Sequence, residues 1–399
     1  MNLKKIPIDQ LKIGMYLVGL DVSWMKTPFV KHRFMIDSQK KLQSLKGLGI
    51  KVVEIDIDKS AYDFNLNSKQ TIVPSEPTIK KIKPNSLSKE INFSKSLESQ
   101  SKRQMKVIFD TLQTDKKADI KGLLNIVSQS NDSILRNGQA LLSLFHANKR
   151  GDLLIDYAFN TMSLALLMGQ RMDISDQELL DLGTAALMMD VGWLMLPTQL
   201  FQQPYPYSDN EFDLVKQHPD LSVDLLEASN FDSSVVGLVA KHHEHIDGSG
   251  YYGYTVEDIP LAAQILSLAD HYNSQVMGCY DGQKIIPATA LRNIYKKISD
   301  GSHDAGLVEL LVQLLGIFPI SSAVQLNTQE KAIVTKVNWR DALKPTISIF
   351  YNKSGEALMK PSNVDLFKQN ESQVQREIKK VLNPLSSIDD PAGILIYSI

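Results

Sequence analysis

Three of the chain's eight histidines lie within four positions, at the start of the stretch 241–252. Acidic and glycine residues follow them at once. The stretch reads Lys241, His242, His243, Glu244, His245, Ile246, Asp247, Gly248, Ser249, Gly250, Tyr251 and Tyr252. Imidazole and carboxylate groups bind transition metals, and successive backbone N–H groups in a turn can hold an anion. The stretch therefore predicts a metal or phosphate site, because a hydrophobic core does not require this composition.

The other residues that could complete such a site come from separate helical segments. An apolar helix ending at Asp190 delivers one carboxylate into the interior, where it needs a partner, a hydrogen-bond network or a metal. His218 follows one helix and precedes a proline, so its ring stands at a break in the helical pattern. Asp270 interrupts the hydrophobic face of another apolar helix.

The sequence thus offers five candidate metal ligands, each at a helix end or at a place where the pattern favours an apolar residue. They are Asp190, His218, His242, His243 and Asp270. Imidazole together with carboxylate suits iron, manganese or zinc, and facing helices are a recurrent scaffold for such sites. Four other histidines, taken singly, are expected to be ordinary core or surface residues: His32, His146, His271 and His303.

Hydrophobic periodicity predicts a mainly α fold, in which a helical domain stands between a small α+β domain and a short antiparallel β extension. The expected regions in chain order are a small α+β domain at 1–61, a flexible linker at 62–96, connecting helices at 97–137, the helical domain at 138–316, and a β meander with a tail at 317–399. The linker follows from its richness in Ser, Asn, Lys and Pro.

Two of these regions carry finer expectations. Period-two patterns at 322–326, 332–337 and 346–351 predict a three-stranded antiparallel meander, and the tail is expected to hold a helix at about 372–382 and a strand at 394–399. The connecting helices could transmit a signal or form a homodimer contact. They could equally pack on the following domain as ordinary core helices.

Composition limits the partners and the compartment. The chain has 43 basic and 45 acidic residues and a net charge of −2, so no overall basic field indicates a nucleic-acid partner. The single cysteine, Cys279, excludes an intramolecular disulfide and a zinc-finger framework, and fits a reducing compartment. The first residues lack the apolar core of a signal peptide, and no run of about 18 apolar residues predicts a membrane span. We expect a soluble, cytoplasmic protein.

Several segments, in order along residues 138–352, resemble the bacterial HD-GYP domain, a branch of the HD metal-dependent phosphohydrolases. They are His218-Pro219, the run His242-His243-Glu244 followed by Asp247-Gly248-Ser249-Gly250-Tyr251, the helix Ile265 to Asp270, and Gly316 to Pro319 leading into Val324-Gln325-Leu326. Residues 4–57 are similar to a small domain often found in front of HD-GYP domains in proteobacteria.

The resemblance implies a helical domain with two or three metal ions, commonly iron or manganese, that hydrolyses cyclic di-GMP to pGpG or GMP. Such ions lower the pKa of a bridging water and polarise the scissile phosphate. The family's metal ligands fall on the five candidates named above, and Asp190 is the expected catalytic carboxylate. The other matched or neighbouring residues are expected to bind the substrate: Lys241, His245, Asp247, Gly248, Ser249, Gly250 and Tyr251.

The chain departs from the family pattern on the metal side and on the phosphate side. Met189 and Thr161 stand where the family has histidine ligands, and a thioether or a neutral hydroxyl is a poor ligand for divalent iron or manganese. Basic residues or a proline of the family are replaced by Trp193, His245, Gln264 and Tyr252. These changes remove the bidentate guanidinium contacts that a doubly charged cyclic dinucleotide favours.

The leading interpretation is therefore a catalytically degenerate HD-GYP protein of cyclic di-GMP signalling, which acts by binding a protein partner or a nucleotide. The alternative is an active phosphodiesterase with a reduced, mononuclear metal site, because five candidate ligands remain. A third interpretation is an interaction scaffold without metal. It is weaker for the His242-His243 pair, since inherited ligands without a metal would leave several buried polar groups to satisfy.

Overall fold

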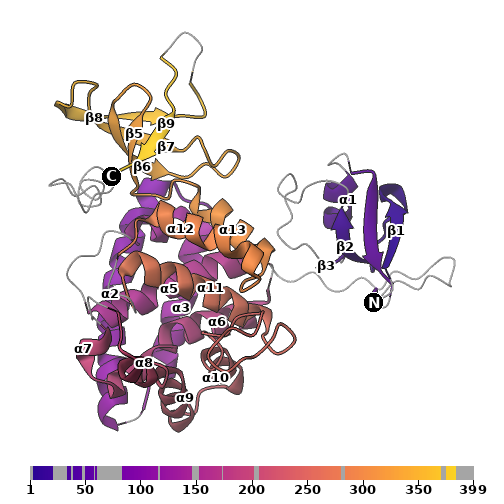
Figure 1. The fold of residues 1–399 in the computed structure, drawn as a ribbon, viewed down its shortest axis with the longest axis vertical. Coiled ribbons are helices and arrows are strands. Elements are labelled where there is room, and N and C mark those ends of the chain that lie inside the picture. Colours follow the sequence, from indigo (N-terminus) through magenta and orange to yellow (C-terminus); the bar gives the residue numbers. More distant parts are fainter. Residues whose placement is uncertain are drawn as a thin grey trace. The chain divides into compact units, whose positions relative to one another are not determined.

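The structure is a computed structural model. It describes residues 3–20, 34–36, 39–46, 50–57, 59–60, 83–115, 117–145, 152–172, 174–201, 206–279, 284–369 and 374–382. The chain divides into two compact units, Met1–Lys81 and Ile82–Ile399 (Figure 1).

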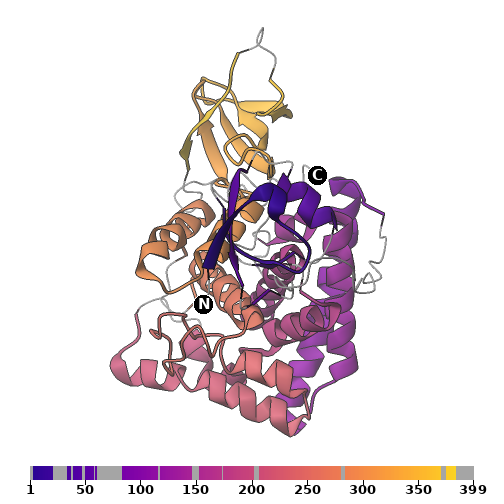
Figure 2. The ribbon, with the colours of Figure 1, turned by 90° about the vertical axis from the view of Figure 1, so that its right-hand side faces the viewer.

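The first unit is an antiparallel sheet with a helix packed on one face (Figure 2). Its described elements are β1 (Leu3–Pro7), η1 (Ile8–Gln10), β2 (Tyr16–Leu20), β3 (Phe34–Met35), α1 (Gln39–Lys46) and β4 (Val52–Asp56), and the strand order is β1-β4-β2-β3. Leu17 and Val53 from the sheet and Leu45 from α1 are fully buried in one core. The expected small α+β domain is confirmed.

The second unit is mainly helical. Its described helices are α2 (Leu87–Asp115), α3 (Ile120–Asn137), α4 (Gln139–Leu144), α5 (Leu153–Arg171), α6 (Asp176–Met188), η3 (Val191–Met195), α7 (Thr198–Phe201), α8 (Asp209–Val215), α9 (His218–Ala228), α10 (Ser233–Val239), α11 (Leu261–Met277), α12 (Pro287–Lys296), η4 (Lys297–Asp300) and α13 (Ala305–Leu315). None of these described helices has the length and apolar character needed to cross a membrane.

Helix α5 is the centre of this unit. It is buried on all sides from Leu154 to Gly169, where apolar residues predominate on every face. The Asp152 side chain caps it by accepting hydrogen bonds from the backbone N–H groups of Leu154 and Ile155. Helices α6 and α11 pack against it, so the carboxylates at the end of α6 and in the middle of α11 are brought to the same interior.

Helix α2 begins inside the region that composition had assigned to the linker. Residues 87–96 are helical, which makes that part of the linker prediction wrong. The reason is tertiary. Ile91 packs with Ala140 and Leu144 of α4, and the buried Glu90 carboxylate pairs with Arg136 of α3. These contacts stabilise a helix that the polar composition of the segment does not favour by itself.

The chain ends in a second antiparallel sheet, drawn in yellow in Figure 1 at one end of the helical domain. Its described strands are β5 (Ala323–Leu326), β6 (Lys331–Lys336), β7 (Thr346–Tyr351), β8 (Ala357–Asp365) and β9 (Ile378–Val381), in the order β8-β7-β6-β5-β9. The expected meander is confirmed as β5 to β7. The helix expected at 372–382 is wrong, because β9 pairs with β5 there. The strand expected at 394–399 lies outside the described residues.

Candidate metal centre

Three imidazole rings lie close together in the interior of the helical domain. His218 is the first residue of α9, and His242 and His243 lie in the turn that follows α10. The Nε2 atom of His218 lies 3.2 Å from Nε2 of His242 and 3.0 Å from Nε2 of His243. Because His218 and His242 are fully buried, these nitrogens face one another away from water.

Backbone carbonyls set the tautomer of two of the rings. The Nδ1 atoms of His218 and His242 each lie 2.6 Å from a carbonyl oxygen, that of Val215 and that of Val239. A carbonyl only accepts, so each Nδ1 carries the proton and each Nε2 of the neutral ring presents a lone pair. Burial lowers the pKa of His242 to about 4, which keeps its ring neutral near pH 7. Such orientation by a carbonyl is typical of metal-bound histidine.

Two carboxylates complete the cluster. Oδ1 of Asp190 lies 3.3 Å from Nε2 of His218, and Oδ2 of Asp270 lies 3.6 Å from Nδ1 of His243. Burial and the nearby Asp190 charge raise the pKa of the Asp270 carboxyl. The structure thus brings ring nitrogens of the three histidines to within 4.8 Å of one another and places each carboxylate beside one ring, a composition that first-row transition metals bind.

Two side chains that position these carboxylates were not singled out for that role by the sequence. The hydroxyl of Tyr157, on α5, donates to Oδ1 of Asp270. The indole Nε1 of Trp193 donates to Oδ1 of Asp190 at 3.2 Å, and its ring stacks on His218 with centroids 5.1 Å apart. Asp190 lies only three residues before Trp193, so that contact is local, whereas the fold brings Asp270 to Tyr157 and His218 to Trp193.

The two residues expected to stand where the family has histidines are packed into the interior. Thr161 and Met189 are fully buried. The Thr161 hydroxyl accepts a hydrogen bond from Nδ2 of Asn273 at 2.8 Å, and the Met189 carbonyl accepts one from the Ser222 hydroxyl at 2.7 Å. Neither side chain adds a nitrogen or a carboxylate to the cluster.

Glu244 holds the glycine-rich loop against the histidines. Its buried carboxylate accepts hydrogen bonds from the backbone N–H groups of Tyr252 and Tyr254, both at 2.9 Å. Gly250 passes so close that a Cβ there would lie 2.6 Å from Cα of Glu244 and 2.8 Å from the carbonyl oxygen of His243. Only glycine permits this approach.

The residues expected to bind substrate fall into two groups. Tyr251 lies directly on the cluster, with its ring centroid 4.6 Å from that of His243. The others make contacts within the loop and its surroundings. Oδ1 of Asp247 accepts hydrogen bonds from the backbone N–H and the hydroxyl of Ser249, which stabilises the turn at Gly248 with its φ of +81°.

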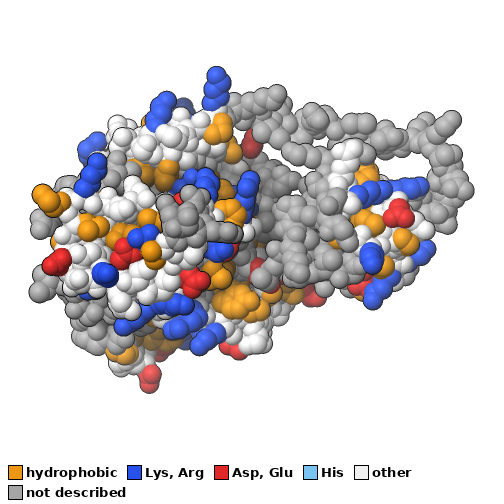
Figure 3. Space-filling model, turned by 90° about the horizontal axis from the view of Figure 1, so that it is seen from above, with side chains coloured by type: hydrophobic (Ala, Val, Ile, Leu, Met, Phe, Trp, Pro, Cys, Tyr) orange, Lys and Arg blue, Asp and Glu red, His pale blue; other side chains and the backbone are white. Residues whose placement is uncertain are grey.

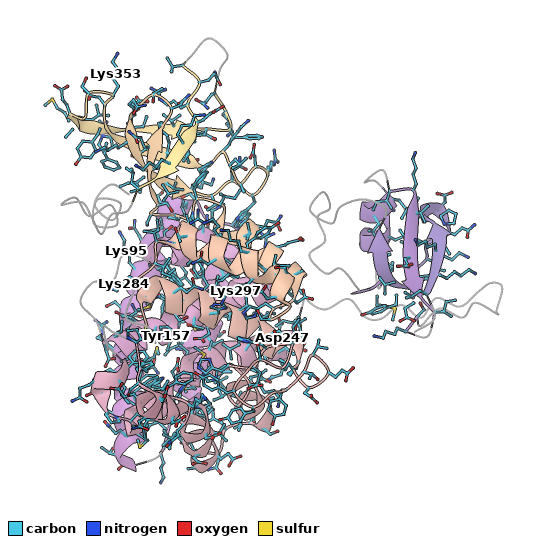
Figure 4. All side chains as sticks on the ribbon, viewed as in Figure 1. Lys95, Tyr157, Asp247, Lys284, Lys297 and Lys353 are labelled. Atoms are coloured by element: carbon cyan, nitrogen blue, oxygen red, sulfur yellow. The ribbon has the colours of Figure 1, made fainter. Side chains whose placement is uncertain are left out.

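The basic side chains of the loop also contact neighbouring aromatic and polar groups. The Lys241 ammonium lies 5.0 Å from the centroid of the Tyr254 ring, and Nδ1 of His245 lies 2.9 Å from the Ser249 hydroxyl. His271 and His303, each expected to be an ordinary core or surface residue, are neighbours in the structure. Nδ1 of His271 lies 2.8 Å from Nε2 of His303. The labelled side chains of Figure 4 show Tyr157 within the helical domain and Asp247 at its edge.

Comparison with protein families matches three successive parts of the chain. A domain of unknown function (DUF3391) matches residues 3–123, an HD domain matches residues 125–305, and a KOW domain associated with HD domain matches residues 323–383. Together these models account for both sheets and for the helices that carry the histidine cluster.

Several relatives of the chain are named as cyclic di-GMP phosphodiesterases. The chain is 27% identical over 376 residues to the cyclic di-GMP phosphodiesterase PA4108 of Pseudomonas aeruginosa, which covers 91% of this chain and 89% of the relative. It is 23% identical over 230 residues to the cyclic di-GMP phosphodiesterase PdeB of Borreliella burgdorferi, covering 57% of this chain and 60% of that protein. Among solved structures, the HDG"Y"P protein Bd1817 of Bdellovibrio bacteriovorus aligns with a TM-score of 0.48 and 18% identity, over 79% of this chain and 99% of that one.

Proposed function

Because this chain is an HD-domain protein with an N-terminal DUF3391 domain, we propose that it acts in cyclic di-GMP signalling through a degenerate, single-ion metal centre. The relatives named as cyclic di-GMP phosphodiesterases support the signalling molecule. In this proposal the centre binds the cyclic dinucleotide without efficient hydrolysis, and the bound state is passed to a protein partner.

The residues present fit one divalent ion, iron or manganese. Nε2 atoms of His218, His242 and His243 would hold it, with a carboxylate of Asp190 or Asp270 as a further ligand. An ion bound there supplies a Lewis acid that polarises a phosphate oxygen and lowers the pKa of a bound water. The chain's own contribution is orientation. Val215 and Val239 fix two rings, while Trp193 and Tyr157 fix the two carboxylates.

The proposed loss of hydrolysis is supported by the residue types at Met189 and Thr161, which supply no ligand for a second ion. Efficient phosphodiester cleavage by paired ions needs ligands for both of them. Met189 and Thr161 occupy the positions of two family ligands and are buried in apolar or hydrogen-bonded packing. Trp193 covers His218 where the family has a lysine, which removes a cation that would stabilise charge on the phosphate.

Metal content and turnover test this proposal together. Purified protein is loaded with Mn²⁺ or Fe²⁺, its metal is counted by mass spectrometry, and binding and hydrolysis of cyclic di-GMP are measured on the same sample. We expect about one ion per chain, a measurable dissociation constant and no turnover above that of the Asp190→Ala variant. Turnover that disappears in Asp190→Ala would contradict the loss of catalysis.

An active phosphodiesterase with one ion is the second candidate, favoured by the three clustered histidines with the carboxylates of Asp190 and Asp270 beside them. Stoichiometric metal with hydrolysis that is lost in His242→Ala would select it. If neither metal nor cyclic di-GMP binds, the proposal of a nucleotide-binding centre fails, and a role limited to protein contacts replaces it.

A further inference from the structure

A cavity of about 750 Å³ lies where the helical domain meets the C-terminal sheet, away from the histidine cluster. Its walls are the junction of α3 and α4, the end of α5, and the ends of β6 and β8 with the loops that follow them. None of the five candidate metal ligands or of the residues of the glycine-rich loop lines it. A cavity of this size suits a small organic ligand, since such pockets are typically about 300–1,000 Å³.

The described lining of this cavity is strongly cationic. Its lysine and arginine side chains are Arg136, Arg171, Lys336, Arg340 and Lys368, and its carboxylate is that of Asp365. Asp365 lies 3.7 Å from the Lys368 ammonium. Seen from above, lysine and arginine side chains stand out in blue on the left-hand body, which contains the C-terminal sheet (Figure 3). The surplus of positive charge favours an anionic ligand.

Arg136 has donor capacity that the protein leaves unused. Its Nε lies 3.0 Å from both carboxylate oxygens of Glu90, which holds the guanidinium in place. Its Nη2 atom is buried and has no hydrogen-bond partner among the described residues. Because Nη2 is shielded, the cations that an anionic ligand in the cavity can contact are Arg171, Lys336, Arg340 and Lys368.

An aromatic ring lies beside these cations. Trp339 is 37% exposed, and the Arg171 guanidinium lies 4.4 Å from its ring centroid. The indole Nε1 donates to the carbonyl oxygen of Leu314 at 3.3 Å, so the ring is anchored while part of it faces the cavity. A second exposed ring, that of Phe367, also lines the cavity. Flat aromatic and guanidinium surfaces stack well on a nucleobase.

The two walls are joined rigidly. Gln139, at the start of α4, donates to the carbonyl oxygen of Val337 at 3.1 Å and accepts from its N–H at 3.0 Å. Both groups are buried, so the end of β6 is held at a fixed distance from the helices. A cavity formed in advance lowers the ordering cost of binding.

We propose that this cavity binds a mononucleotide, with the phosphate on the arginines and the base stacked at Trp339. A free phosphate would contact the cations but not the aromatic rings. An apolar ligand would leave the cations unpaired. The site is independent of the metal centre and of its proposed function. A ligand bound there would contact both the helical domain and the C-terminal sheet, because residues of both line the cavity.

Calorimetry on the full chain tests this with matched probes, in the presence of a chelator that keeps metal-bound phosphate out of the result. The probes are GMP, AMP, guanosine, inorganic pyrophosphate and an eight-residue oligouridylate. We expect GMP or AMP to bind at least about tenfold more tightly than guanosine or pyrophosphate, as stacking and phosphate contacts add. Trp339→Leu and Arg171→Gln should each weaken that binding by about tenfold or more.

Lys353→Gln is the charge-matched control. Lys353 is an exposed lysine in the turn between β7 and β8 and does not line the cavity, so binding should be unchanged (Figure 4). Equal affinity for pyrophosphate and GMP would reduce the site to a simple anion site. Tighter binding of the oligouridylate would make it a single-stranded nucleic-acid surface. Either result overturns the proposal, as does the absence of binding by both mononucleotides.

Discussion

The Nε2 atoms of His218 and His242 lie 3.2 Å apart, although each ring already donates its Nδ1 proton to a backbone carbonyl. Two neutral rings held in this way have no proton to share, so their lone pairs repel. Protonation of either ring would remove this repulsion, but burial lowers the pKa of both rings and so opposes protonation. A divalent cation between the nitrogens removes the conflict.

Metal binding should therefore stabilise the protein. Mn²⁺ or Fe²⁺ at one hundred times its dissociation constant should raise the free energy of unfolding by about 2.7 kcal/mol, because only the folded state presents the three rings together. Thermal unfolding with and without metal measures this. His242→Ala should abolish the shift, whereas His303→Ala, which removes a histidine outside the cluster, should retain it. A shift that survives His242→Ala would place the metal elsewhere.

Restoring a histidine at position 189 should repair the second half of the site. Met189 is fully buried next to Asp190, so Met189→His adds an imidazole beside an existing carboxylate. Combined with Thr161→His, it should bring metal content close to two ions per chain. Cyclic di-GMP hydrolysis should rise at least about tenfold, which corresponds to about 1.4 kcal/mol of transition-state stabilisation. Met189→Leu is the control and should change neither quantity.

Alanine at position 250 should disrupt the loop that covers the histidines. Its Cβ would lie 2.6 Å from Cα of Glu244 and 2.8 Å from the His243 carbonyl oxygen, and backbone atoms cannot easily move aside. We expect Gly250→Ala to lower the free energy of unfolding by about 1–3 kcal/mol. Urea denaturation checks this.

Gly237 of α10 provides the opposite case. A Cβ there meets nothing within 4 Å. Gly237→Ala should raise stability by about 0.5–1 kcal/mol, because alanine reduces the backbone entropy of the unfolded chain. If both substitutions changed stability by the same amount and sign, the close approach at Gly250 would not be the cause.

The Glu90 carboxylate should make the free energy of unfolding depend on pH. Burial alone would raise the pKa of Glu90, but hydrogen bonds from Arg136, Asn85 and Ser133 outweigh it and lower the pKa below the ordinary value of 4.5. The contribution of Glu90 is therefore fully present above about pH 4.5 and is lost as the pH falls through the lowered pKa.

Glu90→Gln should lower the free energy of unfolding by about 1–3 kcal/mol at pH 7, and the difference in stability from the unsubstituted protein should shrink on acidification. Urea denaturation at pH 7 and pH 3 measures both. Glu257→Gln, at an exposed residue, should behave like the unsubstituted protein at each pH.

Local patterns were sufficient where the chain's neighbours in sequence are also its neighbours in space. The capping box of Ser208 and Glu211 opens α8 within four consecutive residues, and alternation correctly predicted β5 to β7. Local patterns failed at residues 87–96 and 372–382. In the first segment Glu90 pairs with Arg136, and in the second β9 pairs with β5. Each partner is distant along the chain and overrides the local preference.

The sequence by itself determined which groups could bind a metal, because imidazole and carboxylate chemistry belongs to the residue types and helical periodicity shows where they interrupt apolar faces. Only the tertiary structure decided how they act. Val215 and Val239 lie three residues before the rings that they orient, so those contacts are local. The fold alone brings the two Nε2 atoms together, stacks Trp193 on His218 and places Tyr157 against Asp270. The cationic cavity at Trp339 is built from elements that the sequence keeps far apart, since only folding converts separation along the chain into contact in space.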